Sequence, residues 1–182
     1  MRLSDVVERA ISILGARIEG RDSKGVRISY LGKGILIGWR DSTGPVHKRL
    51  LEGWLEPGVE EHHFLAMGWF PDDVKAWVLS RRGPKNVNLY QLGLRDYFQE
   101  VERVEIASKM EGEVQEALIR ALKGADLRVE FSKCRYCESR AVTSCEVCGA
   151  ILCSRHAMRC PVCGAVTCHP DTGRCFFVHA HG

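Results

Sequence analysis

The residues best suited to chemistry are cysteines and histidines in the last third of the chain. All nine cysteines of the 182-residue sequence fall between Cys134 and Cys175. Most form CxxC pairs, and such a pair on a tight turn aims two sulfurs at one tetrahedral ion. A disulfide framework is the alternative, but CxxC pairs in a chain without an export signal favour metal ligation. The pattern therefore predicts zinc.

The region offers twelve candidate ligands, enough for three four-coordinate Zn²⁺ per chain. They are Cys134, Cys137, Cys145, Cys148, Cys153, His156, Cys160, Cys163, Cys168, His169, Cys175 and His179. An internal repeat supports the interpretation, because CEVCGAILC at 145–153 recurs as CPVCGAVTC at 160–168. Thiolate-rich sets with four protein ligands are closed, so these sites are expected to be structural rather than catalytic.

The spacing leaves the pairing of the ligands open. A sequential scheme joins neighbouring pairs along the chain. An interleaved scheme gives the groups Cys134, Cys137, Cys153 and His156; Cys145, Cys148, Cys168 and His169; and Cys160, Cys163, Cys175 and His179. The interleaved scheme resembles the cross-brace of RING and B-box domains, which implies a module that docks a protein partner. Adjacent Cys168 and His169 depart from the usual CxxC or CxxH pair, and His181 is the substitute for His169.

Composition narrows the classes of function. The formal charge is +3, but nine bound thiolates and three Zn²⁺ together subtract three charges, so the metal-loaded protein is close to neutral. Nucleic-acid binding must therefore depend on local basic patches. No apolar run approaches the roughly 18 residues of a membrane span, and the N-terminus does not read as a signal peptide. These features predict a cytoplasmic protein without membrane contact, and the scarce amide residues are typical of a thermophile.

The first two thirds of the chain alternate between helical and strand patterns. The expected elements are a helix over 3–14, strands at 17–19, 26–31 and 35–39, a helix after Pro45, a strand at 63–69, a helix from Pro71, a strand at 87–92 and a short helix or turn at 94–98. This order favours a three-layer α/β fold with a mixed sheet. The expected organisation is an α/β domain at 1–106, a connecting helix (about 110–122) and linker at 107–132, and a Cys/His-rich zinc domain at 133–182.

Short motifs within residues 5–98 resemble the restriction-endonuclease-like fold, and locally the Mrr-type restriction endonuclease family. They are Gly25-Val26-Arg27-Ile28, Ile37-Gly38-Trp39-Arg40 and the helix opened by Gly44-Pro45-Val46. The resemblance implies a Mg²⁺ site built from Asp and Glu or Gln, with a Lys that supports the attacking water. Here Arg27, Gly38 and Arg40 occupy those places. It therefore implies a nuclease-like scaffold that no longer cuts.

Together these patterns predict a non-catalytic nucleic-acid-binding adaptor with structural zinc sites. The residues expected to contact the phosphates of DNA or RNA are Arg27, Arg40, Lys48, Arg49, Arg81, Arg82 and Lys85. A protein-interaction module built on the zinc domain is the second hypothesis. The third is an active metal-dependent nuclease that uses displaced carboxylates such as Asp22 or Asp41.

Overall fold

The computed structural model describes residues 2–93 and 103–181, so the turn or helix expected at 94–98 lies outside the described residues. At its centre is a seven-stranded sheet whose strands lie in chain order. They are β1 (Arg17–Asp22), β2 (Gly25–Tyr30), β3 (Lys33–Arg40), β4 (Glu61–Ala66), β5 (Val87–Gln91), β6 (Arg103–Ala107) and β7 (Arg128–Phe131). The sheet is mixed, because β3, β4 and β5 run parallel while β1–β2, β2–β3 and β5–β6 are antiparallel.

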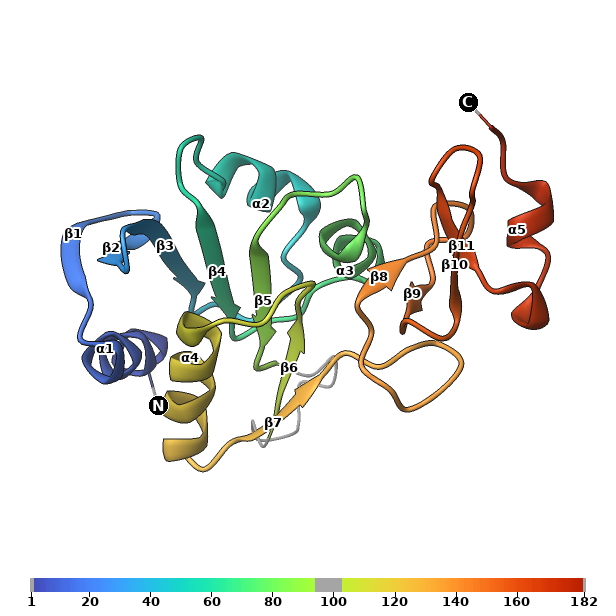
Figure 1. Ribbon diagram of the computed structural model, residues 1–182. Coiled ribbons are helices and arrows are strands. Elements are labelled where there is room, and N and C mark those ends of the chain that lie inside the picture. The colour runs from blue at the N-terminus through green and yellow to red at the C-terminus, as the bar shows by residue number, and fades with distance from the viewer. Residues whose placement is uncertain (1, 94–102, 182) are drawn as a thin grey trace.

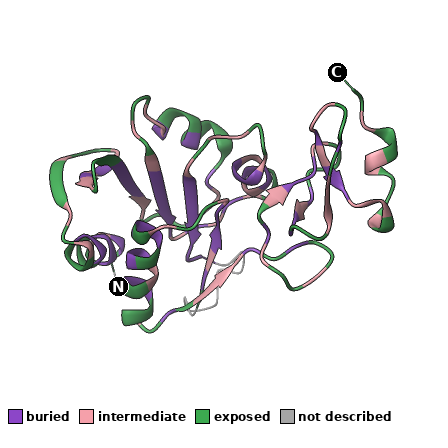
Figure 2. Cartoon of the chain, in the orientation of Figure 1, coloured by how far each residue is buried: buried purple, intermediate pink, exposed green. Residues whose placement is uncertain are grey.

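Helices cover both faces of this sheet (Figure 1). Helices α1 (Leu3–Leu14) and α4 (Glu113–Gly124) share one apolar cluster with the sheet, and α2 (Lys48–Trp54) and α3 (Asp72–Leu79) share another. Alternate residues of β3 feed the two clusters, with Ile35 and Ile37 in the first and Leu36 in the second. A strand covered on both faces needs such a continuous apolar run, and Figure 2 shows the central strands buried. The expected mixed α/β architecture is confirmed.

The early elements follow the expected pattern closely. Helix α1 has the expected bounds, and Gly15 ends it in the left-handed conformation at φ 64°. The β2–β3 hairpin turns at Leu31 and Gly32, both at positive φ. Strand β3 therefore begins at Lys33, two residues before the expected start at residue 35. Such a two-residue turn suits the twist of a hairpin.

Residues 107–132 were expected to form a connecting helix and a linker, and instead they extend the sheet domain. Helix α4 packs beside α1 in the same apolar cluster, and β7 pairs with β6 as the last strand of the sheet. The sheet domain therefore reaches Phe131.

The Cys/His region is built from small elements, of which β8 and β9 lie against α3 and α5 lies farthest from the sheet (Figure 1). They are the paired strands β8 (Thr143–Ser144) and β9 (Ile151–Leu152), the paired strands β10 (Ala157–Arg159) and β11 (Val166–Cys168), the 3-10 turn η1 (Pro170–Thr172) and the short helix α5 (Cys175–Val178). The hydroxyl of Ser144 donates a 2.7 Å hydrogen bond to the Ala76 carbonyl oxygen on α3. Cysteines make up most of the buried cluster of this region. With so few apolar side chains, a metal ion bound by these cysteines would supply much of the folding energy of the region.

Candidate metal centres

Nine cysteines and three histidines of the described chain form three groups of four, with ligand atoms within 4.8 Å of one another in each group. Site 1 consists of Cys134, Cys137, Cys153 and His156; site 2 of Cys145, Cys148, Cys168 and Cys175; and site 3 of Cys160, Cys163, His179 and His181. Each group could hold one metal ion, and the donor set of thiolates and imidazoles is compatible with zinc.

The spacing of the ligand atoms fits a tetrahedral ion. Zn–S bonds of about 2.3 Å imply S···S edges of about 3.8 Å and S···N edges of about 3.6 Å. The sulfurs of Cys137 and Cys153 are 3.7 Å apart, and those of Cys148 and Cys168 are 3.6 Å apart. His156 Nδ1 lies 3.3 Å from the Cys153 sulfur. These S···S distances are far longer than the roughly 2.05 Å of a disulfide, which argues against the disulfide alternative.

Site 3 also suits a metal ion, because one of its buried histidine nitrogens has no hydrogen-bond partner among the described residues. His179 Nδ1 lies at hydrogen-bond distance from the Phe176 carbonyl oxygen, which orients the ring. Its Nε2 is buried and has no hydrogen-bond partner in the described chain. His181 Nδ1 lies 3.7 Å from the Cys160 sulfur. A metal ion in site 3 would satisfy the unpaired nitrogen, because a buried polar atom without a partner is costly.

The tandem repeat appears as two copies of one turn. In each copy the first cysteine N–H donates to the carbonyl oxygen of the alanine five residues later, at 2.8 Å, as for Cys145 with Ala150 and Cys160 with Ala165. The glycine after the second cysteine adopts positive φ, 74° at Gly149 and 73° at Gly164. Glycine suits this conformation, so the CxxCG pattern itself dictates the turn that aims both sulfurs at one ion.

Local hydrogen bonds also tune the thiols for metal binding. Backbone N–H groups of Cys163 and Val162 lower the pKa of Cys160 to about 6, and hydrogen bonds from Ser139 lower the pKa of Cys137 to about 6. Both thiols are therefore readily deprotonated, as coordination requires. Burial raises the pKa of Cys168 to about 12, so this thiol depends on a bound cation to become a thiolate.

The grouping differs from the expected interleaved pairing at three residues. Site 1 has the four ligands of the interleaved scheme, and no site follows the sequential one. Cys175 lies with site 2 rather than site 3, because α5 begins at this residue beside β11. His169, expected as a ligand, caps η1 instead, since its Nδ1 accepts the Asp171 N–H at 3.2 Å. His181, which was expected only as a substitute for His169, lies in site 3 instead.

The three sites cross one another along the chain. Ligands of sites 1 and 2 alternate, and ligands of sites 2 and 3 alternate in the same way, so site 2 is crossed on both sides. Sites 1 and 2 are also tied together by hydrogen bonds. Tyr136, between two site 1 ligands, places its hydroxyl 3.4 Å from the Cys168 sulfur of site 2. The His169 N–H donates to the carbonyl oxygen of His156 at 2.8 Å.

The arginines expected in a nuclease-like groove are already engaged within the protein. Arg27 forms ion pairs with Asp22 and Glu56, and its hydrogen bond to Glu56 lowers the pKa of that carboxyl. Arg40 donates to the Ser42 hydroxyl at 2.6 Å and to the Pro45 carbonyl oxygen at 3.2 Å. Arg27 is paired with Leu36, four residues before Arg40 on β3, so the two Cα atoms lie about 13 Å apart along the strand direction. They do not form one phosphate site.

The remaining expected phosphate contacts lie elsewhere. Lys48 pairs with Glu52 and stands over the Trp77 ring, and exposed Arg49 has no ion pair within the described residues. Arg81 and Arg82 both pair with one carboxylate, Glu146 of the metal region. Lys85 is exposed in the loop that follows α3.

An indole ring covers Gly38, one of the three positions at which the resemblance to nucleases implied an active site. The Trp54 Nε1–H donates to the Lys24 carbonyl oxygen at 2.8 Å and covers Gly38. In the described chain, none of the three groups suited to a metal contains a carboxylate. Asp22 is held by Lys24 N–H and Arg27. Nothing in this geometry restores an oxygen-ligand site there.

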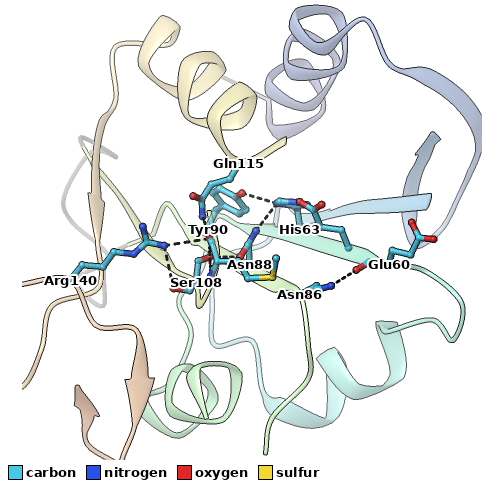
Figure 3. A network of polar contacts seen from close by, with 10 residues as sticks. Glu60, His63, Asn86, Asn88, Tyr90, Ser108, Gln115 and Arg140 are labelled. Atoms are coloured by element: carbon cyan, nitrogen blue, oxygen red, sulfur yellow. Dashed lines mark hydrogen bonds and ion pairs between the residues drawn. The ribbon is translucent and has the colours of Figure 1, made fainter. Parts of the chain in front are cut away.

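A buried polar network on the other face of the sheet was not anticipated (Figure 3). His63 was expected to begin a strand at 63–69; it lies within the central strand β4, and its side chain is fully buried. His63 contacts the Tyr90 hydroxyl at 2.7 Å and the Glu61 carboxylate at 2.6 Å. The network extends through Asn88 and Ser108 to Arg140, which donates to the Ser108 carbonyl oxygen from the metal region. It ties the metal region to the sheet domain.

No protein-family model, curated protein or solved structure matches the chain. Among the described residues, no helix is long and apolar enough to cross a membrane.

Proposed function

We propose that the protein is a non-catalytic nucleic-acid-binding adaptor whose phosphate contacts lie where the sheet domain meets the metal region. Five cations, called here the junction cluster, gather at this place: Arg81, Arg82, Lys85, Lys109 and Arg159. Guanidinium and ammonium groups on a composite surface are the chemistry that a phosphate backbone requires.

The observation that carries the proposal is the convergence of two arginines from separate parts of the chain. The position of a Cβ built on Gly164 lies 3.7 Å from Arg159 Nη2 and 3.8 Å from Arg81 Nη1. Glu146 is the carboxylate that pairs with Arg81 and Arg82, and hydrogen bonding to Arg81 lowers its pKa. One carboxylate among five cations leaves a local excess of about four positive charges.

The loop that carries three of these cations is held in place. Lys109 donates to the carbonyl oxygens of Ser80 at 3.0 Å and Pro84 at 2.9 Å. Burial, with a contribution from the nearby charge of Lys85, lowers the pKa of Lys109. Like charges are brought together here at an energetic cost, which is a feature of sites built for anions.

The ligand set of site 3 keeps this surface cationic. With zinc bound, two thiolates and two neutral imidazoles leave site 3 without net charge, whereas the four thiolates of site 2 leave it at −2. Both sites border the junction cluster, since the site 3 ligand Cys163 precedes Gly164 and the site 2 ligand Cys145 precedes Glu146. On the side of site 3, a bound zinc ion leaves the charges of Arg81 and Arg159 uncancelled.

The absence of catalysis in this proposal follows from the centre of the sheet. The order of helices and strands through β5 resembles the restriction-endonuclease-like plan, and it supports a nuclease-like ancestry. Arg27, Gly38 and Arg40 stand where that plan needs metal and proton chemistry, and Trp54 fills the space over Gly38. The scaffold then serves to hold the junction cluster rather than to cut.

The test is binding of zinc-loaded protein to labelled single- and double-stranded DNA and RNA across a salt series. Arg82→Ala/Lys85→Ala/Arg159→Ala should weaken binding and reduce the salt slope on duplex DNA by up to about 3, at about 0.9 per lost phosphate contact. The matched control, Arg17→Ala/Arg21→Ala/Lys33→Ala, removes the same charge from the other end of the sheet (Figure 1) and should retain most of the affinity.

Two results would contradict this assignment. Equal weakening by both triple variants would show that only total charge matters. Loss of binding in Arg27→Ala/Arg40→Ala, with the junction variant unaffected, would return the interface to the nuclease-like groove.

Protein docking through the metal region is the second candidate. Val162, Phe177 and Val178 are 78%, 71% and 64% exposed, and such apolar side chains are typical of interaction sites. A protein partner should tolerate salt and be lost on Phe177→Asp, whereas nucleic-acid binding should show the opposite response.

A further inference from the structure

We infer that site 3 is an exchangeable metal site, which takes and releases a divalent ion such as Zn²⁺ while sites 1 and 2 keep theirs. Its occupancy fastens the C-terminal strap, residues 174–181, to the turn that carries Cys160 and Cys163. This inference does not depend on the proposed function.

The ligand sets predict the order in which the three sites bind a divalent ion. Site 2 has four thiolates, site 1 has three and a histidine, and site 3 has two thiolates and two histidines. Each thiolate adds a negative charge beside the cation, while an imidazole adds none. Site 3 therefore attracts a divalent ion least strongly and offers the fewest sulfur ligands to Zn²⁺.

The exposure of the ligands also indicates that site 3 releases its ion most easily. In site 1 both Cys134 and Cys153 are buried, and in site 2 both Cys145 and Cys168 are buried. Site 2 also has one exposed ligand, Cys148, but it keeps two buried ones, whereas in site 3 only Cys160 is buried and His181 is exposed. Water and a competing chelator therefore reach the third ion most easily, because a ligand at the surface can leave before the others.

The strap has little to hold it apart from metal ligands. In the described chain, the hydrogen bonds of residues 174–181 stay within that segment, except for ligand contacts such as Cys160 with His181. Helix α5 has four residues, too few to be stable alone. Cys175 anchors one end of the strap at site 2, so loss of the third ion would free the histidine end while the first end stays attached.

Sites 1 and 2 have supports that site 3 lacks. Pairing of β8 with β9 holds Cys145 of site 2 and Cys153 of site 1 in place, and the Tyr136 hydroxyl contacts the Cys168 sulfur of site 2. Donors to ligating groups typically contribute 10-fold to 100-fold to metal affinity. The β10–β11 pairing also keeps the Cys160 turn in place when site 3 is empty, so the site can refill.

The experiment measures zinc release from the fully loaded protein during titration with a chromophoric chelator. We expect one equivalent to leave at least about tenfold faster than the other two. His181→Ala should bind two equivalents and lack the fast phase. His169→Ala is the matched control, a neighbouring histidine outside all three sites, and should keep three equivalents and the fast phase.

Hydrogen exchange on the wild-type chain gives a readout that needs no variant. After release of the first equivalent, residues 176–181 should lose protection while 134–159 keep theirs. Release of all three ions in one phase, persistence of the fast phase in His181→Ala, or first loss of protection at 134–159 would each overturn the inference. If His181→Ala fails to fold, the exchange pattern of the wild type decides.

Discussion

Gly38 provides a direct test of whether Trp54 fills the space above the centre of the sheet. A Cβ at this position would lie 2.5 Å from Trp54 Nε1 and 2.7 Å from the Lys24 carbonyl oxygen. Gly38→Ala must therefore displace the indole, which is 6% exposed and packs edge-on against His62 and Phe64. The backbone oxygen cannot move as easily as a flexible side chain.

Two costs add in this variant. Overpacking of a core typically costs about 1–3 kcal/mol. Breaking the 2.8 Å hydrogen bond from Trp54 to Lys24 leaves a buried donor unpaired, at a further cost of about 1–3 kcal/mol. We therefore expect Gly38→Ala to lower the free energy of unfolding by about 4 kcal/mol.

The assay is urea unfolding at saturating zinc, followed by tryptophan fluorescence and far-UV circular dichroism. Gly53→Ala is the matched control, because a Cβ there meets no atom within 4 Å and the residue lies in α2. It should gain about 1 kcal/mol from helix propensity. A Gly38→Ala protein within about 1 kcal/mol of wild type would refute the reasoning. Trp54 would then swing away cheaply, and the centre could open to a substrate.

Three further outcomes are expected. Cys145→Ser should remove more than one equivalent of zinc by elemental analysis, because site 2 is crossed by both other sites; loss of only one would show that the sites fold independently. Tyr136→Phe should speed zinc release from site 2 by about tenfold or more, and an unchanged rate would remove the hydroxyl from its support. His62→Gln should reduce acid sensitivity: burial lowers the pKa of His62 to about 4, so between pH 7 and 5 the unfolded state alone gains its proton. The wild type should therefore lose about 2 kcal/mol more than the variant over that range, measured by urea unfolding, and equal losses would contradict this account.

Local sequence signals predicted those parts of the fold that local chemistry decides. The apolar stripe of α1, the glycine that ends it and the proline before α3 act within one or two turns of chain. Strands β6 and β7 were not predicted, because they have only five and four residues, with charged residues at alternate positions. Their stability comes from pairing with strands distant in sequence, which a short window of residues does not contain.

The metal ligands show the same division. CxxC turns could be recognised from spacing, since each is a local structure that aims two sulfurs at one point. The partners of each pair are set by tertiary contacts. His169 directly precedes Pro170 and is drawn into capping η1, while His181 reaches back across the strap. Nothing within the histidine spacing distinguishes these two roles.

The net charge of each metal site depends on which ligands are grouped there, and the amino-acid composition does not show this grouping. Nine thiolates and three zinc ions give the same total however the ligands are shared, so the sum is blind to the arrangement. With Cys175 in site 3, that centre would have carried −1 beside Arg81 and Arg159; with His181 there instead, it is neutral and the extra thiolate lies in site 2. Arg27 on the sheet shows the same effect. From the sequence it was expected to contact phosphate, but Glu56, 29 residues away, neutralises its charge. Which surface can bind an anion therefore depends on which groups the fold pairs, and this pairing supports the proposal that phosphate binds at the junction cluster rather than at Arg27 and Arg40.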